Sequence, residues 1–376
     1  MKAGWQLKPF EECIEKVVYT TKVQRKDFLD DGAYPIVSQE DAFINGYWDN
    51  EADLFKVTTP IVIFGDHTKV LKYVDFDFVL GADGVKLLQS REFLSPKYFF
   101  YQLQAANLVS LGYARHYKLL KELKIVYPAR SEQQRIVGIL DEALAGIATA
   151  KANAEKNLRN ARDLSDALIQ SLFPHDSNAP AEHTLEELSE SIVDCEHKTA
   201  PTQDSGIPSI RTPNIGRGKL LLEGVYRVSD STYKEWTRRA EPRPGDLILA
   251  REAPAGNVAV IPEGMKVCLG QRTVLIRPKK NAFDSTYLAY LLLQKNSQRR
   301  LLAHSRGATV QHINVKDIRA FRLADVPSLD EQKAVVVQVE DLLAKEAHLV
   351  SLYHRKFTAL DALKQSLLHQ AFSGQL

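Results

Sequence analysis

The sequence predicts an α+β fold in which two pseudo-repeated globular domains are joined by two long antiparallel coiled-coil helices. The chain has 376 residues, of which 44% are hydrophobic, and this is enough for two domains of ordinary size. One sequence pattern occurs twice, at an offset of about 199 residues. Each copy ends in about forty residues whose apolar positions alternate between spacings of three and four, which places them on one face of a helix.

The repeat is clearest at an E-Q pair, which occurs as Glu132 and Gln133 and again as Glu331 and Gln332. From there the register holds as far as Phe173 and Phe372. Upstream the match is looser, but TPIVIFGDHT (59 to 68) still resembles GDLILAREAP (245 to 254). Because the segments follow in the same order in both halves, we expect a globular segment and a long helix, twice over.

The repeat divides the chain into five segments. They are a first domain (1 to 130), a long helix (131 to 173), a polar, proline-containing linker (174 to 183), a second domain (184 to 329) and a second long helix (330 to 376). Ser131 and Asp330 are the expected N-caps, because acidic first-turn residues follow them. An apolar stripe of this length needs a covering partner, so the helices are expected to pair antiparallel. The alternative is that both are core helices of a single globule.

Short strands are expected inside both domains. Runs of Val, Ile, Tyr and Phe are broken by Gly, Pro, Asn and Asp, which is typical of strands in an irregular α+β domain. These runs lie at 61 to 64, 73 to 80, 247 to 250, 258 to 261 and 273 to 276. Shorter helices are expected near 96 to 106 and 285 to 303.

The composition argues against a membrane protein and against a secreted one. No stretch approaches the roughly 18 to 20 apolar residues of a membrane span, and the first residues lack the apolar run of a signal peptide. The three cysteines, Cys13, Cys195 and Cys268, are far apart, which fits free thiols in a reducing compartment. We therefore expect a soluble, cytoplasmic protein without a membrane partner.

Motifs of the common enzymes are missing from the sequence. It contains no nucleotide-binding glycine loop, no H-E-x-x-H, no G-x-S-x-G and no Asn/Asp-Pro-Pro-aromatic tetrapeptide. Cys195-Glu196-His197 lacks the second ligand pair that a zinc site needs. These absences favour a binding protein over an enzyme, so no catalytic residue and no metal ligand is assigned.

Charge is distributed unevenly along the chain. The whole chain carries only +2, but residues 201 to 330 hold 21 Lys plus Arg against 12 Asp plus Glu, a balance of +9. Residues 1 to 128 hold 16 against 17, a balance of −1. The basic excess predicts a phosphate-contacting surface on the second domain.

Polar and basic loop residues in both halves are candidates for DNA contact, since Arg, Asn and Gln suit base edges and Lys suits phosphates. Those of the first domain are Lys22, Arg25, Lys26, His67, Lys69, Arg115, His116 and Lys118. Those of the second domain are His197, Lys198, Arg211, Asn214, Arg217, Lys219, Arg251, Arg272, Arg306, Gln311, His312 and Asn314. For each of them the alternative is a solvated loop charge. The residues expected to start the helices, with partner-protein contact left open, are Glu132, Gln133, Glu331 and Gln332.

The two E-Q helix starts and the ending LKQSLLHQAFSGQL (363 to 376) resemble the DNA-specificity subunit of Type I restriction-modification systems. The resemblance spans the whole chain and includes GDLILAREAPAGNVAVI (245 to 261). The first half departs from it, because Asp66 and His67 stand where the second half has an Arg-containing turn. Arg251 is therefore left without a matching residue in the first domain.

This resemblance implies two target recognition domains, each of which reads one half of a split, asymmetric site on double-stranded DNA, and a helix pair that sets the gap. It also implies two methyltransferase (M) subunits and restriction (R) subunits as partners. S-adenosylmethionine and base flipping then belong to those partners and not to this chain.

The residues themselves lead to the same general scheme. A duplicated chain predicts two half-sites at a fixed separation, and unlike residues in matching loops, Tyr113 and Arg115 against Ala308 and Gln311, predict unlike half-sites. Two other hypotheses remain. One is an enzyme with a cryptic nuclease or transferase site at Asp66, His67 and Asp83, and the other is a coiled-coil scaffold that binds no DNA.

Overall fold

The computed structural model describes residues 2–81, 84–106, 108–109, 112, 114–173, 183–303, 311–323 and 326–376. All of the expected linker except His183 lies outside the described residues, as do Asp83, Tyr113, Arg306 and Ala308. The chain forms two compact units, Met1–Lys156 with Leu352–Leu376, and Asn157–Ser351. Each unit contains one β-rich domain and part of both long helices.

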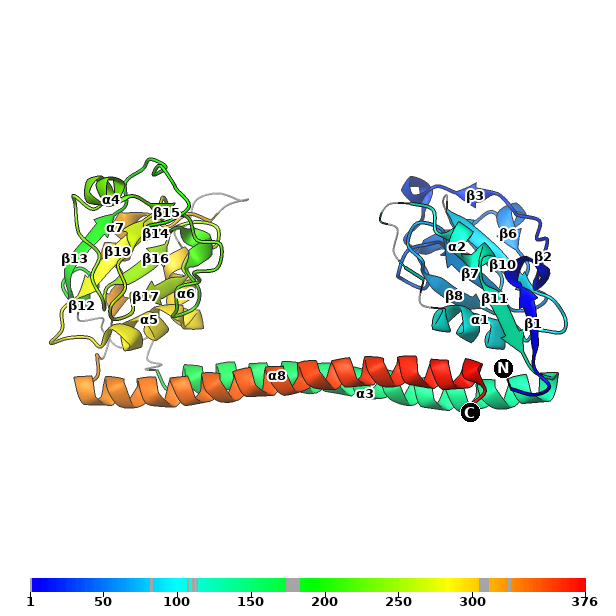
Figure 1. The fold of residues 1–376 in the computed structure, drawn as a ribbon. Coiled ribbons are helices and arrows are strands. Elements are labelled where there is room, and N and C mark those ends of the chain that lie inside the picture. The colour runs from blue at the N-terminus through cyan, green and yellow to red at the C-terminus, as the bar shows by residue number, and fades with distance from the viewer. Residues whose placement is uncertain are drawn as a thin grey trace. The chain divides into compact units, whose positions relative to one another are not determined.

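The first unit is built on a four-stranded antiparallel sheet in the order β2-β10-β7-β8 (Figure 1). The strands are Ile14–Glu15, Val85–Ser90, Ile61–Gly65 and Leu71–Val74. Strand β7 is buried along its whole length because both faces of the sheet are covered. Val62 and Phe64 face the core that includes helix α1 (Pro96–Ala105), whereas Ile61 and Ile63 face a second apolar cluster.

A second sheet of the first unit contains a parallel pair, β4 (Tyr34–Val37) beside β9 (Phe78–Gly81). The other strands around this pair are β3 (Lys22–Val23), β5 (Gly46–Trp48) and β6 (Leu54–Phe55). β1 (Gln6–Pro9) pairs with β11 (Lys124–Tyr127), which leads into the first long helix. The remaining helices are η1 (Phe10–Glu12), η2 (Arg25–Asp27), η3 (Glu51–Asp53) and α2 (Tyr117–Lys121).

The second unit repeats this plan. Its central sheet has the order β13-β19-β16-β17, and β14 pairs with β18 in parallel, as β4 does with β9. The strands are β12 (His183–Thr184), β13 (Ser189–Asp194), β14 (Ile207–Ile210), β15 (Arg227–Val228), β16 (Leu247–Ala250), β17 (Val258–Val260), β18 (Cys268–Leu269), β19 (Thr273–Pro278) and β20 (Arg322–Leu323). The helices are η4 (Thr212–Asn214), α4 (Asp230–Trp236), α5 (Ser285–Leu293), α6 (Lys295–Leu302) and α7 (Val315–Arg319). The shared topology confirms the duplicated α+β fold.

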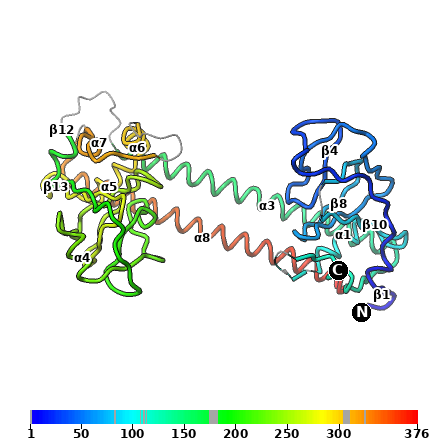
Figure 2. The backbone as a smooth tube through the Cα atoms, turned by 90° about the horizontal axis from the view of Figure 1, so that it is seen from above, coloured from blue at the N-terminus to red at the C-terminus, as the bar shows by residue number. Residues whose placement is uncertain are grey.

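The two long helices are α3 (Arg130–Ser171) and α8 (Leu329–Ser373), which lie side by side (Figures 1 and 2). In the first unit Lys151 of α3 forms an ion pair with Asp361 of α8. In the second unit Arg162 of α3 lies 4.0 Å from Glu346 of α8. In the first unit Arg135 of α3 also donates to the carbonyl of Leu376, just after α8, at 2.7 Å. Partner numbers therefore fall from 376 to 361 as the α3 numbers rise from 135 to 151, so the helices are antiparallel in this unit, as expected. The single-globule alternative does not describe this chain, because its contacts divide it into two units.

Both long helices begin one residue earlier than the expected start, so the predicted N-caps are wrong. Ser131 and Asp330 lie inside the first turn. The cap of α8 is Ser328, whose backbone N–H donates to Glu331 Oε2 at 2.9 Å while Glu331 N–H donates to Ser328 Oγ at 3.4 Å. This reciprocal pair is a capping box, and it satisfies two N–H groups at the start of the helix.

The ends of the long helices enter the domain cores at equivalent places. Phe372 of α8 packs edge-to-face against Tyr98 with ring centroids 5.1 Å apart in the first unit. Phe173, just after α3, stacks on Tyr287 at 5.3 Å in the second unit. Both pairs are the matching aromatic residues of the repeat, so each domain closes around the end of a long helix.

Two expected elements are divided in the structure. The run 73 to 80 forms β8 and β9, because Asp77 turns the chain between them and its Oδ1 accepts a hydrogen bond from Val57 N–H at 2.7 Å. The helix expected at 285 to 303 breaks at Gln294, whose backbone is extended (φ −63°, ψ 147°). The other predicted strands are confirmed, and none of the helices in the described ranges has the length and apolar character needed to cross a membrane.

Candidate nucleic-acid interface

Most of the predicted site residues of the second unit gather at one edge of its central sheet. Because β19 is antiparallel to β13 and β16, the carboxyl ends of those two strands and the start of β19 meet at this edge. Asp194, Arg251 and Arg272 stand there, at or next to the strand ends. His312 reaches the same edge from the segment before α7, where it forms an isolated bridge with Glu252.

These edge residues form a continuous polar network around Arg251. The guanidinium of Arg251 donates to both carboxylate oxygens of Asp194 at 3.0 Å, to Ile313 O at 2.9 Å and to His312 Nε2 at 2.9 Å. Since a guanidinium only donates, His312 Nε2 is the acceptor. The imidazole proton is therefore on Nδ1, which lies 2.6 Å from Glu252 Oε1.

The network separates residues that shape the edge from residues that face solvent. Arg251 is only 8% exposed and its donors are used within the chain, so its place is structural in the free protein. Arg272 pairs with Glu252 at 3.0 Å, yet its side chain is largely exposed, and its backbone has a positive φ of 64°. The predicted residues exposed on the loops around this edge are His197, Lys198, Arg211, Arg272, Gln311 and Asn314.

Asn214 was expected to contact DNA, but its amide is used inside the second unit. Its Oδ1 accepts from Arg211 N–H at 3.1 Å and its Nδ2 donates to Leu221 O at 3.1 Å. The side chain is 9% exposed. Asn214 therefore holds the backbone of Arg211, whose own side chain is exposed.

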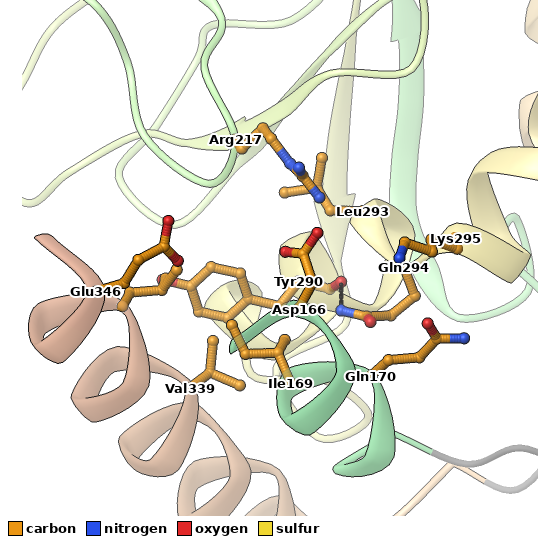
Figure 3. A pocket seen from close by; sticks show the side chains of 11 residues that line it. Asp166, Ile169, Gln170, Arg217, Tyr290, Leu293, Gln294, Lys295, Val339 and Glu346 are labelled. Carbon is orange, nitrogen blue, oxygen red and sulfur yellow. Dashed lines mark hydrogen bonds between the residues drawn. The ribbon is translucent and has the colours of Figure 1, made fainter. Parts of the chain in front are cut away.

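Arg217 and Lys219 are not part of the edge network. Arg217 lines a pocket of about 220 Å³ beside the long helices, together with Asp166, Tyr290 and Glu346 (Figure 3). Burial raises the pKa of the Tyr290 hydroxyl. Lys219 follows in the same loop, where its carbonyl accepts from Gly216 N–H at 2.9 Å.

The first unit has the same edge with different side chains. Asp66 N–H donates to Gly84 O at 2.7 Å, and Asp66 O accepts from His116 N–H at 2.7 Å. In the second unit Arg251 N–H likewise donates to Arg272 O, and Arg251 O accepts from Ile313 N–H. Asp66 thus occupies the position of Arg251, as the departure in the sequence indicates. Its Oδ1 accepts from Tyr117 N–H at 2.8 Å and so caps α2. His116 is buried against Asp66 O at 3.0 Å.

The other first-unit candidates differ in how freely they face solvent. Lys22 donates to Val85 O at 3.4 Å, Lys69 donates to Leu108 O at 3.2 Å, and Arg25 is paired with Glu40 at 3.0 Å. His67 is half-buried, and its backbone N–H donates to Gln39 Oε1 at 3.3 Å. The exposed candidates without an ion pair among the described residues are Lys26, Arg115 and Lys118.

Several organising residues of these edges were missed from sequence. Asp194 and Glu252 hold the basic residues, but a search for positive charge passes over them. Lys72 lies on β8, is 3% exposed and donates to Ala42 O at 2.5 Å and to Asn45 Oδ1 at 3.1 Å. Burial lowers the pKa of Lys72 to about 8. The alternation of side chains along β8 places Lys72 on the inward face, and this pattern could have revealed the buried lysine from sequence.

The described residues offer no metal site. They contain no group of three or more His, Cys, Asp or Glu side chains arranged to hold an ion. Cys195 is buried, and burial raises the pKa of its thiol.

The glutamines of the two E-Q pairs make identical contacts. Gln133 Oε1 accepts from Ser95 N–H at 2.7 Å, and its Nε2 donates to Phe93 O at 2.9 Å and Pro128 O at 3.0 Å. Gln332 accepts from Asp284 N–H and donates to Ala282 O and Pro327 O, each at 2.8 Å. Both glutamines are 0% exposed, so they join each domain to the start of its long helix and offer no surface to a partner.

Comparisons with family models, curated proteins and solved structures all find similarity to proteins of Type I restriction-modification systems. The model of the Type I restriction modification DNA specificity domain matches residues 196–348. The EcoR124I/EcoR124II specificity subunit of Escherichia coli is 22% identical over 339 residues, which cover 84% of this chain and 80% of that subunit. The EcoBI specificity subunit of E. coli is 24% identical over 286 residues, 69% of this chain and 60% of that subunit.

Solved structures share the fold over the full length of the chain. One, from work on complex assembly and conformational transition of the type I R-M system, has a TM-score of 0.72 at 18% identity and covers 100% of this chain and 99% of that one. The HsdS subunit from Thermoanaerobacter tengcongensis has a TM-score of 0.52 at 18% identity and covers 100% and 98%. With the duplicated domains and the paired helices, these matches show that the chain is similar to DNA specificity subunits of Type I restriction-modification systems in sequence and in fold.

Proposed function

We propose that this chain is the non-catalytic subunit that gives a Type I restriction-modification complex its sequence specificity, and that each domain reads one half of a bipartite site on double-stranded DNA. One observation carries the proposal. The same sheet edge occurs twice, but its loops expose Arg115 in the first unit and Gln311 in the second. Two copies of one reader fit two half-sites, and unlike exposed residues in matching loops fit unlike half-sequences.

The exposed residues divide by chemistry between phosphates and bases. Lys26 and Lys118 in the first domain and Lys198 in the second are suited to phosphates. Arg115, Arg211 and Gln311 are suited to base edges. The balance of +9 over residues 201 to 330 supports the larger phosphate-contacting surface in the second domain.

In this proposal the long helices set the gap between the half-sites. Both α3 and α8 continue without a break from one unit into the other, and a continuous helix has a fixed rise per residue. Residues 1 to 130 and 184 to 329 are then the target recognition domains. Residues 131 to 173 and 330 to 376 are the spacer.

Methyltransferase subunits are proposed to dock on the helices. Several large apolar side chains remain exposed there, which is the surface that a protein partner covers. They are Leu164, Leu168, Val337, Leu349, Leu352 and Leu363. The full complex then holds two methyltransferase subunits, which bind S-adenosylmethionine, and restriction subunits, and it acts in the cytoplasm.

Methylome mapping tests the proposal. Methylated adenines are mapped genome-wide in cells that carry the cognate methyltransferase with and without this chain. We expect a bipartite methylated motif only when the chain is present. An unchanged methylome would contradict the assignment.

The enzyme and scaffold hypotheses predict different results, which assays of the purified chain and of DNA binding distinguish. A cryptic active site in the first domain predicts methyl transfer or cleavage by the purified chain alone. The geometry disfavours it, because Asp66 is used as the cap of α2. A scaffold without DNA binding predicts no sequence-dependent DNA binding even when the methyltransferase is present.

A further inference from the structure

One position at the end of equivalent strands is framed in the same way in both units but holds different residues. Val37 pairs with Leu80 in the first unit, and Ile210 pairs with Leu269 in the second. The next residues along β4 and β14 are Ser38 and Arg211, so these two positions correspond. An asparagine holds each backbone, since Ser38 N–H donates to Asn45 Oδ1 at 2.8 Å and Arg211 N–H donates to Asn214 Oδ1 at 3.1 Å.

A glycine on the neighbouring strand completes the frame. A Cβ atom at Gly81 would lie 2.7 Å from Ser38 Cβ, and one at Gly270 would lie 2.5 Å from Arg211 Cγ. Both distances are too short for a real contact, so each glycine allows its neighbour to pack closely. The same backbone support, made by the asparagine and the glycine, thus carries Ser38 in the first domain and Arg211 in the second. Ser38 is 1% exposed, whereas Arg211 is exposed.

The support fixes the direction of the Arg211 side chain. Its stem lies against Gly270, and its guanidinium lies over the Tyr226 ring, 5.4 Å from the centroid. Tyr226 is itself 53% exposed, so the pair is at the surface. A guanidinium held by an aromatic face keeps its hydrogen-bond donors directed outward.

Arg211 also differs in its partners from four arginines of the second unit that are tied to carboxylates. Arg239, Arg251, Arg272 and Arg277 form ion pairs with carboxylates. Within the described residues, no carboxylate lies within ion-pair distance of Arg211. A cavity of about 240 Å³ lies beside it and is lined by Thr199, Thr202, Ser209 and Gln271.

We infer that Arg211 reads a guanine base in the half-site bound by the second domain. The inference rests on the proposed function and adds the base that this position selects. A planar guanidinium can donate two parallel hydrogen bonds to guanine O6 and N7 in the major groove. Its fixed orientation reduces the conformational entropy lost on binding, whereas a phosphate contact needs no such orientation. The first domain, with buried Ser38, does not read its half-site in this way.

The test substitutes Arg211 in the full chain and maps the methylated motif in cells with the methyltransferase. Arg211→Ser places the first domain's residue on the second domain's support. We expect one G·C position, in one half-sequence only, to become degenerate, with discrimination reduced by about 5- to 150-fold. Arg211→Lys is expected to relax the same position, because lysine keeps the charge but loses the planar two-donor geometry.

Two further variants separate base reading from general effects. Arg238→Ser removes an exposed arginine whose Nε donates to Glu235 O at 3.0 Å, and it is expected to leave the motif unchanged. Tyr226→Leu removes the ring beneath the guanidinium and is expected to relax the same position less than Arg211→Ser does. The intact other half-sequence and gap report that each variant is folded and assembled.

The outcomes distinguish this inference from the proposed function. If the wild-type chain directs no bipartite motif, the proposed function fails. If it does, but Arg211→Ser weakens methylation evenly without changing the motif, Arg211 contacts phosphate and the inference is overturned. A wild-type motif without a G·C pair in either half also overturns it.

Discussion

Gln133 and Gln332 show how one side chain connects a domain to a helix. Each primary amide is fully buried and satisfies one main-chain N–H and two main-chain carbonyls. Such groups are costly to leave unpaired in a protein interior. The E-Q pair in the sequence therefore has a physical cause, which is the junction itself.

Gln133→Ala is expected to lower the free energy of unfolding of the chain by about 3 kcal/mol, because three buried main-chain groups lose their partner. Urea denaturation measures the effect. The matched control is Gln134→Ala, since Gln134 is the next residue and is exposed, and it should change the value by less than about 0.5 kcal/mol. Equal effects of the two variants would show that the junction does not depend on the buried amide.

Lys72 makes the stability of the first domain depend on pH. Its pKa is about 8 in the folded chain and about 10.4 in an unfolded one. Below pH 8 both states are protonated and the cost of the buried charge is fully present. Between these values the folded state has released the proton and the unfolded state has not, so the free energy of unfolding rises with pH.

Between pH 7.5 and 9.5, the free energy of unfolding of the wild type is expected to rise by about 2 kcal/mol relative to that of the Lys72→Met variant. Thermal or urea unfolding of both chains across this range measures it. Lys56→Met, at an exposed lysine, is the control, and its difference from the wild type should stay flat. A constant difference for Lys72→Met would mean that Lys72 keeps its proton throughout.

At the scale of elements, the long helices were predictable because their signal is local and repeated. Every third or fourth residue is apolar, and residues such as Ile136 and Leu140 are indeed buried. Breaks were harder to predict, because a run such as 73 to 80 is apolar on both sides of its turn. Asp77 turns the chain by bonding to Val57, and that partner is known only from the fold.

The residues of the candidate site could also be predicted only in part. Basic loop residues were found from sequence, but their burial was not, since it depends on distant partners. Arg251 is paired with Asp194 and His312, 57 and 61 residues away. Exposed Arg211 and buried Arg251 look alike in sequence, because both follow an apolar strand.

Two leucines of α3 provide a test of partner docking. Leu140 is 0% exposed and Leu164 is 60% exposed. Leu140→Ala should cost about 2 to 5 kcal/mol of stability. Leu164→Ala should change stability by less than about 0.5 kcal/mol but should reduce co-purification of the methyltransferase. Full retention of the methyltransferase by Leu164→Ala would argue against docking at this site.

At the scale of the whole molecule, the spacer proposal makes a prediction about length. Removing four residues from α3 between positions 150 and 165, and the four facing residues from α8, shortens both helices by about 6 Å. This corresponds to about two base pairs of DNA. We expect the methylated motif to keep both half-sequences and to lose about two base pairs from its gap.

The same methylation map contains the control for this deletion, because intact half-sequences show that both domains are folded and reading DNA. A changed half-sequence with an unchanged gap would reverse the assignment of roles. A motif identical to that of the wild type would show that the helices do not set the spacing.

The glutamine junction also bears on how such a chain acquires new targets. On the domain side, Gln133 and Gln332 contact only main-chain atoms, and the residues that supply them differ: Phe93 and Ser95 in one half, Ala282 and Asp284 in the other. A domain with this backbone turn therefore keeps the glutamine hydrogen bonds whatever side chains the turn carries, and the remaining fit to the helix depends on apolar contacts such as that of Tyr98 with Phe372. If each domain reads one half-site as proposed, exchange of a domain at this junction would preserve these main-chain hydrogen bonds and would transfer a whole reader to the same helix.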